Sequence, residues 1–256
     1  DQPPLEARFA KVTGEKNPWN HTAATVGFAA ADFDNDGDLD LVEINDNSAC
    51  RLLINRRLGQ WTAEEFAEDI VPWARYNGGL VGDFNSDYRI DLMLVSPDGP
   101  VVYLSNELVA GQIDRLPDFK PVTTDLTGLR AAQVLDADYD GWLDVIGLGT
   151  SPANIVLGSN RPRGLLARPE WLSGLLEGRP PVQAVLAADF MGQGWHQVLV
   201  LHAGQTPTLL QTAGNGNHWI TLQTAGHRNV AEYNRKFPRS NPDGIGTRVM
   251  IHSGPS

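Results

Sequence analysis

One acidic loop pattern recurs three times along this chain at nearly even intervals. The pattern is Asp-x-Asp/Asn-x-Asp-x-x-x-Asp, and its copies begin at Asp32, Asp83 and Asp136. The steps between these first aspartates are 51 and 53 residues, and a further step of 53 residues reaches Asp189. A repeat of this length predicts similar small units packed side by side, because one unit alone is too small to bury its apolar residues.

The chemistry of the loops favours calcium. Alternate side chains in a tight loop can turn their oxygens toward one point, and a hard cation takes about six to eight oxygen ligands. Asp, Asn and Gly also favour plain polar turns, but clustered carboxylates repel one another without a cation. Recurrence with one spacing favours the metal, and we expect about three Ca²⁺ ions. The predicted ligands, with the seventh position contributing its backbone carbonyl, are Asp32, Asp34, Asp36, Asp38 and Asp40; Asp83, Asn85, Asp87, Arg89 and Asp91; and Asp136, Asp138, Asp140, Trp142 and Asp144.

The first loop also fits the EF-hand pattern, since Glu43 stands at its twelfth position. The twelfth position is Leu94 in the second loop and Gly147 in the third, and neither can supply the bidentate carboxylate of an EF-hand. Short apolar runs flank the loops, so we expect each loop to join two strands. These expected strands lie at residues 26–31, 39–44, 90–95 and 143–148.

Further apolar segments complete units of about 40 to 50 residues, a length typical of repeat folds. A third strand is expected at residues 51–55, 101–105, 153–158 and 206–211, and a fourth at residues 61–66, 119–123 and 9–13. Residues 161–171 are expected to lead into a short helix near Pro169. Four short strands per unit predict an all-β fold, namely a β-propeller of about four recognisable four-stranded blades that form a closed small ring or part of a larger propeller.

The unit that begins at Asp189 departs from the metal pattern. It has Met191 at the third position, Gln193 at the fifth and Gln197 at the ninth. One carboxylate with two amides and a thioether is a poor calcium site. We therefore expect a blade without metal, whose strands at residues 184–188 and 198–201 still pair.

Two parts of the sequence resemble known families. Residues 28–42, with weaker copies at 81–83 and 134–136, resemble the FG-GAP or VCBS repeats of integrin α-subunit propellers and many secreted bacterial proteins. This resemblance covers roughly residues 20–212 and implies calcium between the first two strands of a blade. Residues 214–222 and 240–249 resemble the opening of the ASPIC/UnbV module of cartilage acidic protein and its bacterial relatives. Together, the two resemblances imply propeller repeats over residues 1–212, followed by the start of a short, truncated β module over residues 213–256.

Composition limits the classes of partner. The formal net charge is −11, and three calcium ions would offset six of these negative charges. Without a basic patch, a chain of this sign is not expected to bind nucleic acid. No run of about 18 apolar residues is present, so no membrane-spanning segment is expected. Loops without an EF-hand carboxylate suit calcium at about millimolar concentration, which places the protein in the extracellular space, on the cell surface or in the periplasm.

The sequence contains no Gly-x-Ser-x-Gly, His-Glu-x-x-His or phosphate-binding glycine-rich motif. We therefore expect no enzyme, but a secreted calcium-binding propeller that acts as a non-catalytic adhesion or protein–protein interaction module. In this interpretation the calcium is structural. The alternative is an accessory or structural subunit of a larger extracytoplasmic enzyme or electron-transfer complex. Both interpretations imply protein partners.

Overall fold

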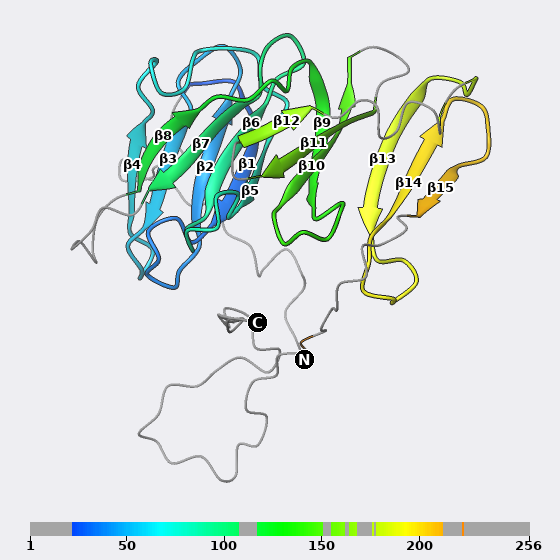
Figure 1. The fold of residues 1–256 in the computed structure, drawn as a ribbon. Helices are drawn as coiled ribbons and strands as arrows, with labels where there is room; N and C mark the ends of the chain where they lie inside the picture. Colours follow the sequence, from blue (N-terminus) through cyan, green and yellow to red (C-terminus); the bar gives the residue numbers. More distant parts are fainter. Residues whose placement is uncertain are drawn as a thin grey trace, which may run out of the picture.

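The computed structural model describes residues 22–107, 117–150, 155–161, 164–167, 176, 178–211 and 222. All regular secondary structure within these residues is β-strand, and the strands form four antiparallel sheets (Figure 1). The prediction of an all-β fold is therefore confirmed for these residues. No helix in this described part is long and apolar enough to cross a membrane.

Each sheet is a meander, in which the strands pair with one another in sequence order. The first sheet contains β1 (Thr25–Ala31), β2 (Asp40–Asn45), β3 (Arg51–Asn55) and β4 (Trp61–Glu65). The second contains β5 (Gly78–Gly82), β6 (Asp91–Val95), β7 (Val102–Glu107) and β8 (Asp118–Val122). The third contains β9 (Leu129–Leu135), β10 (Asp144–Gly149), β11 (Ile155–Arg161) and β12 (Gly164–Ala167). The fourth contains β13 (Val182–Ala188), β14 (Gln197–His202) and β15 (Thr208–Gln211).

In the second and third sheets, the second strand is buried at every residue because a neighbouring sheet covers each of its faces. In β6, Leu92 and Leu94 belong to the apolar core shared with the first sheet. Met93 and Val95, which alternate with them, belong to the core shared with the third sheet. Burial on both faces explains why the sequence of this strand is continuously apolar after Asp91 instead of alternating with polar residues.

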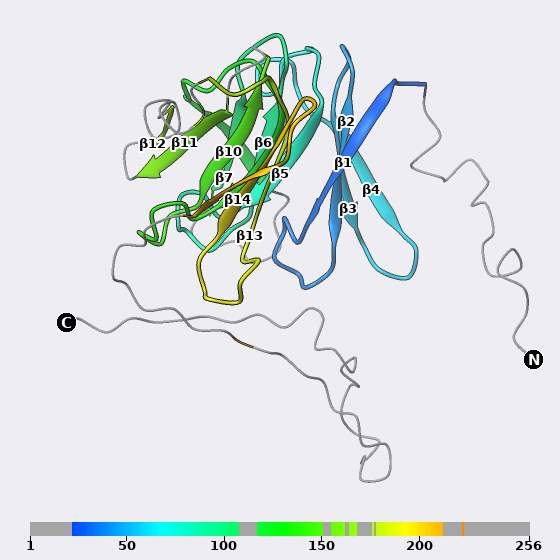
Figure 2. The same cartoon turned by 90° about the vertical axis from the view of Figure 1, so that its right-hand side faces the viewer.

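The apolar core forms three layers, one between each pair of consecutive sheets. The first strands β1, β5, β9 and β13 are neighbours in that order, so the first and fourth sheets end the row (Figures 1 and 2). Close packing between the first two sheets requires Gly79 in β5. A Cβ atom there would lie only 2.8 Å from Cδ1 of Ile44 and 3.3 Å from the carbonyl oxygen of Met93.

The expected strands that flank the acidic loops are present as β1, β2, β6 and β10. The sequence did not predict β12, which pairs with β11 at residues 164–167, where the approach to a helix was expected. Pro169, the expected fourth strand at residues 9–13 and almost all of the predicted C-terminal module at 213–256 lie outside the described residues.

Candidate metal centres

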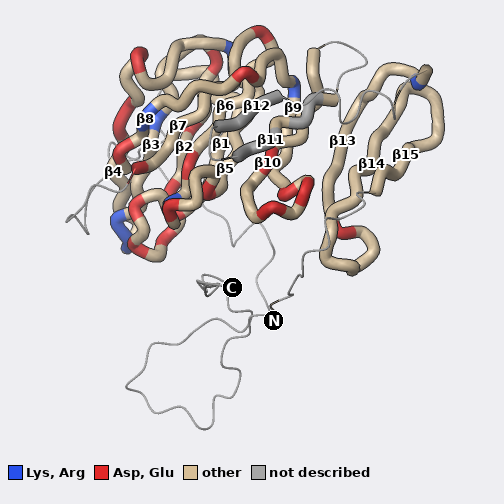
Figure 3. Tube along the Cα trace, in the orientation of Figure 1, with Lys and Arg blue, Asp and Glu red and all other residues tan. Residues whose placement is uncertain are grey.

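The acidic loops all occupy the same place in their sheets, between the first and second strands. They lie along the lower side of the molecule in Figure 1, and Figure 3 shows acidic residues gathered in the first and third of them. The equivalent loop of the fourth sheet joins β13 to β14 and contains Asp189. One side of the molecule therefore presents all four copies of the loop.

The first aspartate of each loop folds the loop backbone. Asp32 accepts hydrogen bonds from the backbone N–H groups of Asp36 at 2.9 Å and Gly37 at 3.0 Å. Asp189 accepts the same two bonds, from Gln193 at 3.0 Å and Gly194 at 2.7 Å, and these bonds lower the pKa of its carboxyl. The equivalent bonds in the other loops run from Asp87 and Tyr88 to Asp83, and from Asp140 and Gly141 to Asp136. The fourth loop therefore keeps this part of the conformation without the acidic set.

The backbone of the loops repeats as closely as their hydrogen bonds. The sixth position has a positive φ in every copy, which glycine adopts without strain. Tyr88 occupies this position in the second loop with φ of 71°, where Gly37 and Gly141 stand in the first and third. The loop conformation therefore persists even with a residue that disfavours it.

The ninth position ties each loop to its own sheet. Asp40 and Asp91 are completely buried, and each carboxylate accepts one backbone N–H bond of 2.9 Å from the loop and another of 2.9 Å from the third strand. Asp144 accepts the corresponding loop bond at 2.8 Å. In the fourth loop, the side-chain oxygen of Gln197 accepts that bond from Phe190, also at 2.8 Å. The bond to the loop therefore does not require a charged side chain.

Burial also changes the acidity of this position. Loss of hydration raises the pKa of Asp40 and of Asp91 from 3.8 to about 6, although their backbone hydrogen bonds act in the opposite direction. A cation near these carboxylates would favour the ionised form. A bound metal can therefore offset the electrostatic cost of ionising Asp40 and Asp91 in the folded protein.

In the calcium-free protein, we expect folding stability to increase when the pH falls from 7.5 to 5.0. Between pH 3.8 and about 6, the folded state keeps protons on Asp40 and Asp91 that the unfolded state releases. This stabilisation is lost as the pH rises through about 6, and each group contributes on the order of 1 kcal/mol. Urea unfolding in EGTA at the two pH values measures the effect. A lower urea midpoint at pH 5.0 would contradict it.

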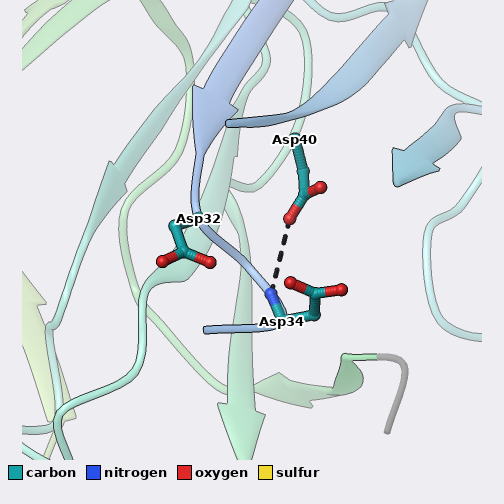
Figure 4. A group of neighbouring side chains, drawn as sticks. All are labelled: Asp32, Asp34 and Asp40. Atoms are coloured by element: carbon teal, nitrogen blue, oxygen red, sulfur yellow. Dashed lines mark hydrogen bonds between the residues drawn. The ribbon is translucent and has the colours of Figure 1, made fainter. Parts of the chain in front are cut away.

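Two groups of carboxylates have the spacing that a single cation requires. Asp32, Asp34 and Asp40 each offer one oxygen within 4.8 Å of the others, and the same holds for one equivalent triplet in the third loop. Calcium oxygens lie at about 2.3 to 2.6 Å, so two ligands of one ion can be at most about 5 Å apart. Figure 4 shows the first group, in which the backbone N–H of Asp34 contacts the carboxylate of Asp40 at 3.4 Å. The triplet in the third loop consists of Asp136, Asp138 and Asp144.

The remaining predicted ligands of these two loops do not join the triplets. Asp36 and Asp140 each accept a backbone N–H bond of 2.9 Å from the seventh position of their own loop. Asp38 contacts an arginine, and Trp142 is expected to contribute only its carbonyl. Sequence position therefore predicted the acidic loops but did not distinguish their converging oxygens from those that shape the turn.

The second loop contains no such carboxylate triplet, because its third position is an amide. The Asn85 side chain accepts the backbone N–H of Asp87 at 3.1 Å and donates to Ser105 at 2.9 Å. The first, fifth and ninth positions, Asp83, Asp87 and Asp91, keep the same backbone bonds as in the first loop. Any cation in this loop would therefore depend more on neutral oxygen ligands.

The side chain of Arg89 points away from the second loop toward the first. Its guanidinium donates to the carbonyl oxygen of Phe33 at 3.1 Å and to the side chain of Asn106 at 3.2 Å. The Asn106 amide donates to the same Phe33 carbonyl at 2.8 Å. The side chain of Arg89 is thus bonded away from its own loop, and its backbone carbonyl stays the predicted ligand at this position.

Two arginines contact the first loop, and the sequence pattern did not predict these contacts. Arg56 and Arg57 follow β3 directly, and a guanidinium nitrogen of Arg56 lies 3.5 Å from a carboxylate oxygen of Asp34. Arg57 contacts the carboxylate of Asp38, which raises the pKa of the arginine, and donates to the carbonyl of Asp36 at 2.7 Å. The signal in the sequence was two adjacent arginines directly after the expected third strand. These arginines offset part of the negative charge of the loop.

In the part of the chain that the structure describes, the fold is all-β and two acidic groups could hold metal ions. No protein-family model matches this chain, and no curated protein matches it. Among solved structures, the chain is similar to the crystal structure of the V. cholerae biofilm matrix protein Bap1, with 17% sequence identity and a TM-score of 0.39. The similarity covers 68% of this chain and 23% of the Bap1 chain, so it spans less than a quarter of that chain.

Proposed function

We propose that this chain is a calcium-stabilised β-propeller, or part of one, built from FG-GAP-like repeats. Four successive antiparallel sheets with the same strand order support the proposal, as do first strands that are neighbours along the row. Propeller blades stack face to face and turn their first strands toward a common axis. The acidic loops lie between the first and second strands of each sheet, as expected for one repeated unit.

The observation that carries the calcium proposal is the pair of carboxylate triplets at equivalent positions of the first and third loops. All the ligands they offer are oxygens, which suit a hard cation. Calcium is favoured over magnesium because an irregular loop with several carboxylates meets the looser geometry of calcium more easily than a strict octahedron. The second loop is proposed as a weaker site, since Asn85 replaces one carboxylate.

The proposed role of calcium is structural. Asp32 follows the last residue of β1 and Asp40 is the first residue of β2, so an ion between them links two strands of one sheet.

In this proposal the protein works outside the cytosol as an adhesion or protein-interaction module. Loops without a bidentate closing carboxylate suit the higher calcium concentrations found there. The loops between strands present the variable surface of such a fold, and they are the usual place for partner recognition. Binding of the purified chain to the surface of its source cells, with calcium and with EGTA, tests this role.

Calcium stoichiometry provides the direct test of the metal sites. Equilibrium dialysis with radioactive calcium is expected to give two tight sites and a third weaker one. Asp34→Ala removes one converging ligand and should abolish one tight site, whereas the matched substitution Asp189→Ala should leave the count unchanged. Absence of binding at millimolar calcium, or equal effects of the two substitutions, would reject the assignment.

A further inference from the structure

The first three sheets share a pair of buried apolar positions on their second strands. These two positions face the sheet that follows in sequence, and in each case they belong to the core layer between the two sheets. Their side chains are at most 4% exposed. The three pairs are Val42 and Ile44, Met93 and Val95, and Ile146 and Leu148.

The fourth sheet has the same pair of positions, but no further sheet follows it within the described residues. Leu199 and Leu201 are the equivalents, one further repeat of 53 residues along the chain. Leu201 is 40% exposed. In the first three sheets, this position packs against the following sheet. In the fourth sheet, an apolar side chain occupies the same position without a following sheet in the described residues.

The exposed face extends across all three strands of the fourth sheet. Leu186 on β13 is opposite Leu199, which is in turn opposite Leu209 on β15, so the three leucines form a row across the sheet. Leu186 and Leu209 are each 44% exposed. Strands β13, β14 and β15 contain no Asp, Glu, Lys or Arg. A continuous apolar face of this kind marks a surface that packs against another element.

We propose that residues 213–256 of this same chain cover the exposed face of the fourth sheet. The chain order supports this occupant, because each of the first three sheets is covered by the segment that directly follows it. Residues 213–256 lie in the chain directly after β15 and residue 212, which is the place that the covering segment has after each of the first three sheets. Their sequence supplies two apolar runs, Trp219-Ile-Thr-Leu222 and Val249-Met-Ile251. Leu222 is itself 50% exposed, so this segment also has apolar surface to bury.

The experiment measures thiol alkylation in the full chain after Leu201→Cys. The native Cys50 is completely buried and gives a slow background. Leu58→Cys is the matched control, because Leu58 is 98% exposed and lies far from the fourth sheet in sequence. Each rate is divided by the rate of the same variant in denaturant. We expect Cys at position 201 to react at least tenfold more slowly than Cys at position 58, at every protein concentration tested.

A second pair of variants identifies the segment responsible. The double substitution Trp219→Asp and Ile220→Asp places charges in the first apolar run and should restore rapid alkylation at position 201. Asn215→Asp with Asn217→Asp adds the same charge nearby and should leave the protection intact. Equal rates at positions 201 and 58 would overturn the proposal. Protection that grows with protein concentration would show that a second copy covers the face. Protection that the Trp219 and Ile220 substitutions leave unchanged would show that another part of the chain covers it. Either result also overturns the proposal.

Discussion

Removal of calcium with excess EGTA is expected to lower the thermal unfolding midpoint of this protein by about 10 to 20 °C. The ion is proposed to bind the folded loops only, so its binding free energy adds to the stability of the folded state. At a free calcium concentration 100 times the dissociation constant, each site contributes about 2.7 kcal/mol. For a chain of this size, 1 kcal/mol moves the midpoint by about 2 to 4 °C.

The measurement is differential scanning calorimetry with calcium, with EGTA, and with EGTA plus excess magnesium. Magnesium should restore little of the stability, because the loops do not enforce octahedral geometry. Asp189→Ala serves as the matched variant, since its loop is not a proposed site, and its response to EGTA should equal that of the native chain. A midpoint that EGTA leaves unchanged would remove the structural role of calcium.

Asp91→Ala is expected to destabilise the calcium-free protein by about 3 to 5 kcal/mol. Because this comparison is made without calcium, the effect is separate from metal binding. Asp91 is fully buried, and its carboxylate accepts the backbone N–H groups of Phe84 and Asn106 at 2.9 Å and the hydroxyl of Tyr103 at 3.1 Å. The substitution would deprive three buried donors of this acceptor and leave a cavity. Each such donor costs about 1 to 3 kcal/mol, partly offset by removal of a carboxylate that ionises unfavourably.

Urea unfolding in EGTA provides the free energy of unfolding for this comparison. Asp98→Ala is the control, because Asp98 is exposed and forms only a surface ion pair with Arg75 at 3.2 Å. It should change stability by less than about 1 kcal/mol. Asp91→Asn should fall between the two, since it keeps one side-chain oxygen as acceptor. If Asp91→Ala and Asp98→Ala had equal effects, the buried carboxylate would not hold the loop to its sheet.

The sequence predicted the strands beside the acidic loops because the loops mark where those strands begin and end. The strand β6 could be recognised as buried from its unbroken apolar run after Asp91. The strand β12 was missed because Gly164-Leu-Leu-Ala167 shows no alternation and lies close to Pro169. The pairing of β12 with β11 compensates for this weak local preference, and pairing between strands is not visible in a short stretch of sequence.

The spacing of the aspartates predicted which residues form the loops, but not how they divide their roles. Asp40 bonds to the N–H of Asn55, 15 residues away on the third strand. Arg57 reaches Asp38 across 19 residues because the turn after β3 returns to the loop. Both contacts depend on the register of β2 with β3, which a pattern of nine residues does not contain. The first aspartate of each loop depends on no such register, since Asp189, like its equivalents, bonds to N–H groups of its own loop.

The carbonyl of Phe33 has a consequence for how neighbouring loops behave. It lies between Asp32 and Asp34 in the first loop and accepts hydrogen bonds from both Arg89 and Asn106. The backbone of Asn106 is in turn bonded to Asp91, the last residue of the second acidic loop. One chain of buried hydrogen bonds therefore joins the two acidic loops, and we expect a shift of the first loop to strain the bonds that hold the second.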